Sequence, residues 1–135
     1  MDIKLLIPQR EPIIMVDKII SHSQDRTTTS FIIKDDNIFL EKNIFQSSGL
    51  IENIAQSAAA RMGLQISKGT NKSPLIGYIA SIKNMIIYRL PEVGEVILTG
   101  VRVTNQINNI IVIQGESKVN EMLTSTCELK VFIQE

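Results

Sequence analysis

Residues 49–60, GLIENIAQSAAA, constrain the fold of this 135-residue chain more than any other segment of its sequence. Small and apolar side chains recur there at helical spacing, and Ser47 or Ser48 is a suitable N-cap, so we predict a helix that runs to about residue 66. Four alanines in this helix let a β-sheet wrap closely around it, because bulkier side chains would hold the two backbones apart. The segment therefore predicts one buried central helix packed against a sheet.

Two polar residues, Glu52 and Gln56, interrupt this apolar helix. Residues four apart lie on the same face of a helix, so both side chains point the same way. Burial among apolar neighbours favours the protonated form of a carboxyl group, which suits a general acid or base near neutral pH. We therefore predict catalytic roles for both. Two alternatives stay open: Glu52 complements the positive end of the helix dipole, and Gln56 is a buried amide that satisfies a strand backbone group.

The composition excludes several classes of function. Basic and acidic residues balance, 14 against 14, and no basic cluster favours binding to nucleic acid. The single cysteine, Cys127, excludes an intrachain disulfide, and with the single histidine, His22, it leaves no metal-ligand cluster of the usual spacing. We expect Cys127 to be a small core residue and His22 a solvated turn residue. We expect neither a metal nor a cofactor.

The chain also lacks the features of an exported or membrane protein. No apolar run approaches the roughly 20 residues that a membrane helix needs, and the N-terminus has no signal-peptide pattern. We therefore expect a cytoplasmic protein that binds neither membrane nor nucleic acid.

Outside the helix, the chain reads as β-strands separated by polar turns. We predict strands at residues 13–20, 26–33, 75–90, 95–104, 110–119 and 122–133. Turns or loops are predicted at residues 21–25, 38–46, 91–94, 105–109 and 120–121, with a short helical turn at 3–7 and the end of the central helix at 68–71. The expected architecture is one α+β domain over residues 1–135, an antiparallel sheet wrapped around one long central helix.

A sheet of this size has edge strands that need cover. The hydrophobic residues 110–113 predict that this strand pairs with a second copy, which would give a two-fold dimer with a continuous intersubunit sheet.

Three segments of the chain carry a resemblance to a known family. Residues 6–17, LIPQREPIIMVD, resemble the family's opening segment LPHRxPxLLVD, and residues 50–56, LIENIAQ, resemble its central-helix segment LIxEAxAQ. Residues 79–84 and 89–95 resemble its strand and turn AGIDxAxFxRPVxPGD. The chain thus resembles the hotdog-fold 3-hydroxyacyl-carrier-protein dehydratase superfamily, which implies a sheet wrapped around a long helix.

The resemblance implies elimination of water from a 3-hydroxyacyl thioester carried on acyl carrier protein. The family's catalytic acid falls at Glu52. A base removes the proton next to the thioester carbonyl, and an acid protonates the departing hydroxyl. The backbone N–H groups of Gly49 and Leu50, at the positive start of the helix, are expected to polarise the thioester oxygen. We also assign Gln9, in the opening segment, to substrate binding.

The chain departs from the family pattern at both histidines. The family's catalytic histidine lies in a GHFPGxP loop before the helix, but residues 37–48 contain no histidine, and Gln9 replaces the histidine of the opening segment. A glutamine cannot act as a general base at physiological pH. The short loop resembles a divergent branch found beside aryl polyene and flexirubin pigment genes, which shares a GLxENxAQxAAA helix.

Three functions remain open at this stage. The chain is a dehydratase-like protein that acts on or binds 3-hydroxyacyl or enoyl thioesters of acyl carrier protein, in biosynthesis of the fatty-acid or polyene pigment type. Alternatively, it is a non-catalytic or half-site subunit of a hotdog heterodimer, whose histidine-bearing partner supplies the base. A third reading is an acyl thioesterase, because hotdog enzymes use a helix carboxylate to activate water.

Overall fold

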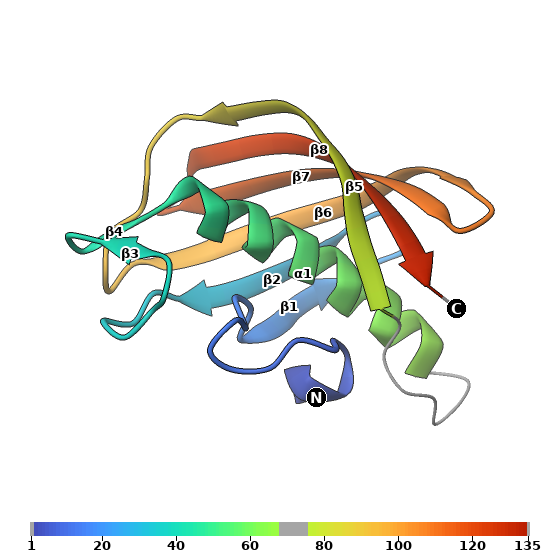
Figure 1. Cartoon of the computed structure of the whole chain (residues 1–135), viewed down its shortest axis with the longest axis horizontal. Helices are drawn as coiled ribbons and strands as arrows, with labels where there is room; N and C mark the ends of the chain where they lie inside the picture. The colour runs from blue at the N-terminus through green and yellow to red at the C-terminus, as the bar shows by residue number, and fades with distance from the viewer. Residues whose placement is uncertain (1, 68–75, 135) are drawn as a thin grey trace.

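The computed structural model describes residues 2–67 and 76–134, and in them one long helix lies in the hollow of a curved antiparallel sheet (Figure 1). The helix, α1, spans Ser47–Ser67. In spatial order the sheet contains β1 (Lys18–His22), β2 (Thr27–Ile32), β6 (Val96–Ile107), β7 (Ile110–Val119), β8 (Met122–Gln134) and β5 (Ile76–Ile87). The other described elements are a 3-10 helix, η1 (Ile3–Leu5), and the paired strands β3 (Leu40–Glu41) and β4 (Ile44–Phe45). The predicted α+β architecture is confirmed.

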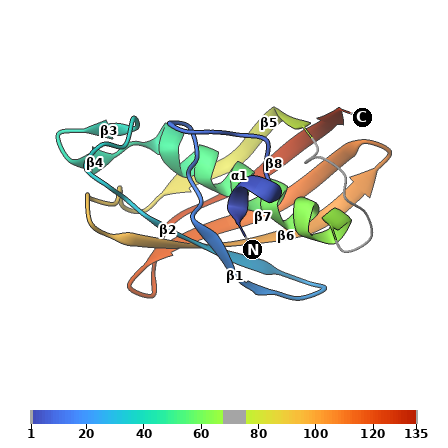
Figure 2. The ribbon, with the colours of Figure 1, turned by 90° about the horizontal axis from the view of Figure 1, so that it is seen from below.

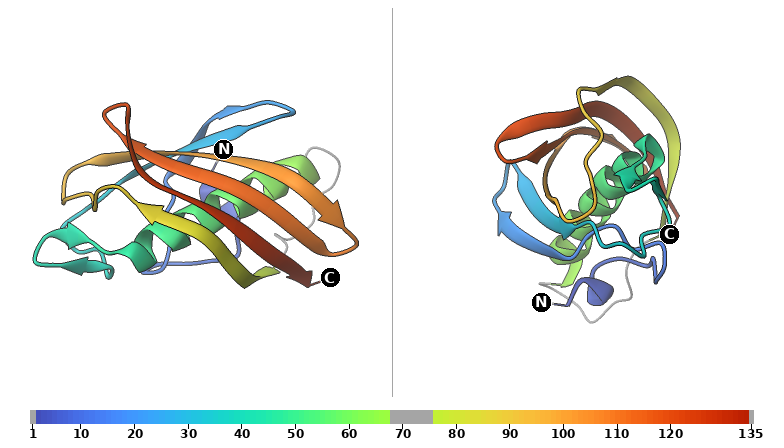
Figure 3. Two further views of the ribbon diagram at one scale, coloured as in Figure 1. Left: turned by 90° about the horizontal axis from the view of Figure 1, so that it is seen from above. Right: turned by 90° about the vertical axis from the view of Figure 1, so that its left-hand side faces the viewer.

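The sheet curls around α1, as the end-on view in Figure 3 shows. Along β7 every second residue from Ile111 to Val119 is buried, which is the alternation of a strand with one face on the core. The helix approaches this strand so closely that a Cβ atom at Gly115 would overlap the side chain of Ile54. The small-residue helix therefore does what its composition predicts and lets the sheet close around it.

Two buried amides on α1 hold the N-terminal segment against the helix. Gln56 Oε1 accepts a hydrogen bond of 2.6 Å from the Met15 N–H, and Gln56 Nε2 donates to the Ile13 carbonyl at 2.9 Å. Asn53 Nδ2 donates to the Met15 carbonyl at 2.7 Å. Figure 2 shows the N-terminal segment lying along the helix. The Ile13 carbonyl and both backbone groups of Met15 thus obtain their hydrogen bonds from helix side chains.

This arrangement corrects the predicted strand at residues 13–20. The observed strand, β1, begins only at Lys18, where pairing with β2 starts. The apolar run before it extends along the helix, because Asn53 and Gln56 supply the hydrogen bonds that a neighbouring strand would otherwise supply. A run of β-branched residues predicts extended backbone but does not identify its partner.

The predicted pairing of residues 110–113 with a second copy is wrong. These residues begin β7, which lies between β6 and β8, so both sides of its backbone are already paired within the chain. The two edge strands of the sheet are β1 and β5. Any extension of the sheet by another chain must therefore use one of these two strands.

The predicted turns agree with the observed turns better in position than in length. The predicted turn at 105–109 shrinks to two residues because β6 continues to Ile107, and the predicted loop at 38–46 contains β3 and β4. The connection at 120–121 is confirmed: Asn120 and Glu121 both have positive φ, 50° and 69°, as a two-residue hairpin turn requires. Strand β5 ends at Ile87, earlier than predicted. The predicted helix end at 68–71 lies outside the described residues.

Arg61 fixes the hairpin between β1 and β2 to the helix. Its side chain is buried, and its guanidinium donates to the carbonyls of Ser23 and Gln24 and to Thr27 Oγ1. These hydrogen bonds to neutral oxygens compensate in part for the removal of this cation from water, and its buried Nε has no partner among the described residues. The far half of α1 is therefore tied to the sheet edge opposite β5.

Replacing Asn53 with alanine is expected to lower the free energy of unfolding by about 2–4 kcal/mol, because it leaves the Met15 carbonyl and the Thr99 hydroxyl buried without their partner. Urea unfolding followed by circular dichroism measures this. As a control, Asn105→Ala at an exposed position of β6 should change the unfolding free energy by less than about 0.5 kcal/mol. Equal effects of the two substitutions would contradict this account of the N-terminal segment.

Candidate functional site

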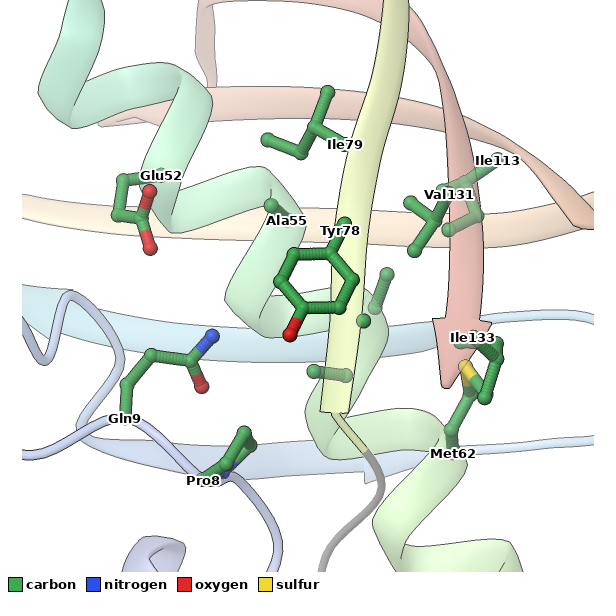
Figure 4. Close-up of a pocket in the computed structure, with 13 residues that line it drawn as sticks. Pro8, Gln9, Glu52, Ala55, Met62, Tyr78, Ile79, Ile113, Val131 and Ile133 are labelled. Carbon is green, nitrogen blue, oxygen red and sulfur yellow. The ribbon is translucent and has the colours of Figure 1, made fainter. Parts of the chain in front are cut away.

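A cavity of about 240 Å³ lies between the N-terminal segment, α1 and strand β5 (Figure 4). The residues that line it are Pro8 and Gln9, then Glu52, Ala55, Ala58, Ala59 and Met62 of α1, and Gly77, Tyr78, Ile79, Ile113, Val131 and Ile133 of the sheet. Most of them are small or apolar. Glu52 is the one carboxylic acid among these lining residues, and none of them is a histidine. Such a space suits an apolar ligand with one polar group beside the acid.

Glu52 is held by its neighbour on the same helix face. Gln56 Nε2 donates a hydrogen bond of 2.9 Å to Glu52 Oε1, so the predicted proximity of these two side chains is observed. They differ in surroundings: Glu52 is half-buried and lines the cavity, whereas Gln56 is fully buried and bonds the backbone of the N-terminal segment. Gln56 thus orients the acid without lining the cavity itself.

Gln9 reaches the same cavity from the N-terminal segment. In Figure 4 its amide end is turned toward the cavity and lies between Glu52 and Pro8, pointing toward Tyr78. Its Oε1 atom is buried without a hydrogen-bond partner among the described residues. The backbone beside it is fixed by Arg10, whose guanidinium donates to the carbonyls of Lys4, Ile7 and Gln9. The fold therefore brings together three of the five predicted site residues: Gln9 and Glu52 line the cavity, and Gln56 bonds Glu52.

The other two predicted site residues, Gly49 and Leu50, do not line this cavity. Both backbone N–H groups donate to the Gln46 carbonyl, at 3.0 and 3.3 Å, and Leu50 is fully buried. A Cβ atom at Gly49 would overlap the ring of Phe45, so glycine is required there for packing. Their role toward a thioester oxygen stays a prediction.

His22 and Cys127 lie away from the cavity lining. His22 ends strand β1, which corrects the predicted turn position, and its Nδ1 lies 2.7 Å from Thr27 Oγ1 in a half-buried site. Cys127 is fully buried in the core against α1, as predicted. Burial raises the pKa of the Cys127 thiol to about 11, because the thiolate would lose its hydration.

Neither a metal site nor a membrane-spanning helix is found in the part of the chain that the structure describes. Residues 2–67 and 76–134 contain no group of three or more histidine, cysteine, aspartate or glutamate side chains placed to hold a metal ion. Over the same ranges, no helix is long and apolar enough to cross a membrane.

Sequence reasoning missed the strand wall of the cavity. Gly77, Tyr78 and Ile79 come from an edge strand that is remote in sequence from the helix, and nothing in their spacing indicates that they face Glu52. The family-like segment at 79–84 was the one available signal, and it pointed to the fold rather than to a site. Three of the four alanines that let the sheet approach α1, Ala55, Ala58 and Ala59, also line the cavity.

The comparisons with known proteins agree on the fold. A family model described as ApeP-like, ApeP dehydratase, matches residues 1–135. None of the curated protein sequences matches the chain. A chain of the dehydratase heterocomplex ApeI:P from Xenorhabdus doucetiae superposes with a TM-score of 0.91 at 14% sequence identity, and the match covers 100% of this chain and 92% of that chain.

Two more distant structures share the same architecture. A hypothetical thioesterase from Streptococcus pneumoniae TIGR4, solved with coenzyme A, has a TM-score of 0.66 at 10% identity, over 87% of this chain and 84% of that one. The PaaI protein of the E. coli phenylacetic acid degradation operon has a TM-score of 0.67 at 12% identity, over 85% and 81%. At these identities the likeness concerns the fold alone, and it confirms the predicted hotdog fold.

The buried Cys127 thiol is expected to resist modification. Because its pKa is raised to about 11, it remains protonated at pH 8 and should react with a thiol reagent at least about a hundredfold more slowly in the folded protein than in urea. Reaction with an aromatic disulfide reagent, followed by absorbance, measures both rates. Similar rates in the folded and unfolded protein would show that the thiol is accessible.

Proposed function

The chain belongs to the ApeP-like dehydratase family, and we propose that it is a dehydratase-like hotdog protein that acts on or binds 3-hydroxyacyl thioesters of acyl carrier protein. The observation that supports this proposal is the cavity itself: a mostly apolar space bordered by one carboxylic acid, Glu52, one neutral amide, Gln9, and the hydroxyl group of Tyr78, which donates to Gln134 Oε1. A thioester with an apolar acyl chain and a single hydroxyl group matches that distribution of polarity.

In the proposed reaction Glu52 is the acid. A base takes the proton from the carbon next to the thioester carbonyl, the carbon–oxygen bond at the third carbon breaks, and the hydroxyl leaves as water with a proton from Glu52. Gln56 orients the carboxyl group through its 2.9 Å hydrogen bond. Gln9 binds substrate as a neutral hydrogen-bonding group and takes no proton. The N–H groups of Gly49 and Leu50 are the groups expected to polarise the thioester oxygen. For this, the ligand must replace the Gln46 carbonyl as their hydrogen-bond acceptor.

The chain is best suited to be half of a site. None of the described residues that line the cavity is a histidine, so a second hotdog subunit is needed to supply a base of that kind. Strand β5 is the edge where such a subunit fits, because it borders the cavity and exposes the apolar residues Ile79, Ile82, Ile86 and Ile87. The similar ApeI:P structure is a dehydratase heterocomplex by its own description. We therefore favour a hotdog heterodimer over a homodimer.

Thioester hydrolysis is the second candidate. A structural relative solved with coenzyme A is described as a hypothetical thioesterase, and a carboxylate at the position of Glu52 can activate water. The two reactions differ in product: dehydration yields an enoyl thioester and hydrolysis a free acid.

We further propose that residues 1–135 act as one cytoplasmic domain, in biosynthesis of the fatty-acid or polyene pigment type. The family model spans the same residues.

Replacing Glu52 with glutamine is expected to lower the rate of enoyl formation by roughly 10²–10⁴-fold with little change in KM, because the side chain keeps its shape and loses its proton. The assay uses 3-hydroxyacyl carrier protein and the purified chain, both alone and with each hotdog paralogue encoded beside it. Glu41→Gln, at an exposed position of β3, is the matched control and should leave the rate unchanged. Undiminished turnover in Glu52→Gln would remove Glu52 from the mechanism, and release of free acid would favour the thioesterase.

Placing a charge on the exposed side of β5 is expected to prevent subunit association. Ile82, 41% exposed in the isolated chain, would be buried by a paired subunit, so Ile82→Asp should yield monomers in light scattering coupled to gel filtration. The control is Ile20→Asp on the opposite edge strand, where the isoleucine is 47% exposed. Dissociation by Ile20→Asp and not by Ile82→Asp would place the interface at β1 instead.

A further inference from the structure

The cavity extends past Glu52 into a region with no polar side chain on α1. Protein interiors are normally close-packed, and yet small residues of the helix, Ala55, Ala58 and Ala59, border about 240 Å³ that this chain leaves unfilled. Apolar space of this kind suits an apolar ligand. The helix could have filled it with leucine or isoleucine, as it does at Leu50 and Ile54, which are fully buried in the core.

The helix residues that line the cavity are arranged along the axis of α1. Glu52, Ala55, Ala59 and Met62 follow one another at spacings of three and four, so they form a single row along α1. From Glu52 to Met62 the helix rises roughly 15 Å. A ligand whose reacting carbons lie beside Glu52 therefore has its tail directed along the alanines toward Met62.

Strand β5 faces this row with a residue that has no side chain. A Cβ atom at Gly77 would lie 3.0 Å from Val131 Cγ1 and 3.4 Å from Ile133 Cδ1, and both of these residues line the cavity. A larger side chain at this position would therefore occupy cavity space. The backbone does not demand glycine here, because positive φ is found at Gly94 and not at Gly77. Glycine inside a strand weakens it, so its presence fits a position where space is needed.

We propose that Ala59 and Gly77, one on the helix and one on the strand, determine the length of acyl chain that the cavity accepts, and that its ligands carry long, unbranched apolar tails. The inference rests on the proposed function, since it assumes that the thioester group lies beside Glu52. It adds the class of acyl chain and the two residues that select it.

The test measures binding rather than turnover. The probes are 3-hydroxybutyryl, 3-hydroxyoctanoyl and 3-hydroxydodecanoyl pantetheine in which an amide replaces the thioester, titrated calorimetrically into the full chain or into its complex with a hotdog partner. For the unmodified chain, affinity should rise roughly fourfold for each methylene that enters the cavity. Ala59→Leu and Gly77→Val should each weaken binding of the longest probe by at least about tenfold and change binding of the shortest by less than about twofold.

The matched control is Gln65→Leu, which adds the same side chain to the same helix at an exposed position outside the cavity lining, and it should change none of the three affinities. A misfolded variant would lose affinity for all three probes alike. The three affinities therefore distinguish misfolding from selection of acyl chain length. Equal affinity for all three probes in the unmodified chain overturns the inference and leaves the proposed function standing. Failure to bind any probe overturns both. Chain-length selection without turnover on the natural thioester supports the inference and rejects the catalytic role.

Discussion

The rest of the structure depends on the hydrogen bonds between two helix amides and the backbone of the N-terminal segment. Asn53 and Gln56 are fully buried, and together they bind the N–H and carbonyl of Met15 and the carbonyl of Ile13. Buried amides have a high desolvation cost, so they are stable only when their partners are fixed. This requirement specifies the path of the segment, and with it the position of Gln9 beside the cavity.

The same interaction connects the fold to the chemistry. Gln56 has one carbonyl oxygen and one NH₂ group, and it uses the oxygen for Met15 and the NH₂ group for both Ile13 and Glu52. The acid is thus oriented by a side chain whose own orientation is enforced by the backbone. A flipped amide would place NH₂ against the Met15 N–H and its oxygen against Glu52, and neither contact is attractive when Glu52 is ionised. Gln56 is thus the buried amide bonded to backbone groups that the sequence allows as an alternative, and its predicted catalytic role stays a prediction.

The sequence predicted best what depends on local periodicity. The helix, the strands 110–119 and 122–133, and the turn at 120–121 follow from spacing and turn chemistry, and the pairing of Glu52 with Gln56 follows from helix geometry. It failed where a segment's partner lies far away in the chain. Ile13 and Met15 bond the helix rather than a strand, and residues 110–113 begin a central strand rather than an edge, because strand order depends on long-range packing that no window of sequence contains.

In the proposed reaction, the walls of the cavity determine the side from which a base of a second subunit reaches the substrate. The residues contributed by β7 and β8, which are Ile113, Val131 and Ile133, are apolar and belong to the core, so an ionised group placed there would lose its hydration without a partner. The N-terminal segment contributes a proline and a neutral amide, and α1 contributes the acid and small side chains. The side along β5 remains, where the strand has an unpaired edge and exposed isoleucines. A histidine from a second subunit docked on β5 would reach the substrate opposite Glu52, and the neutral Gln9 would not compete with it for the proton.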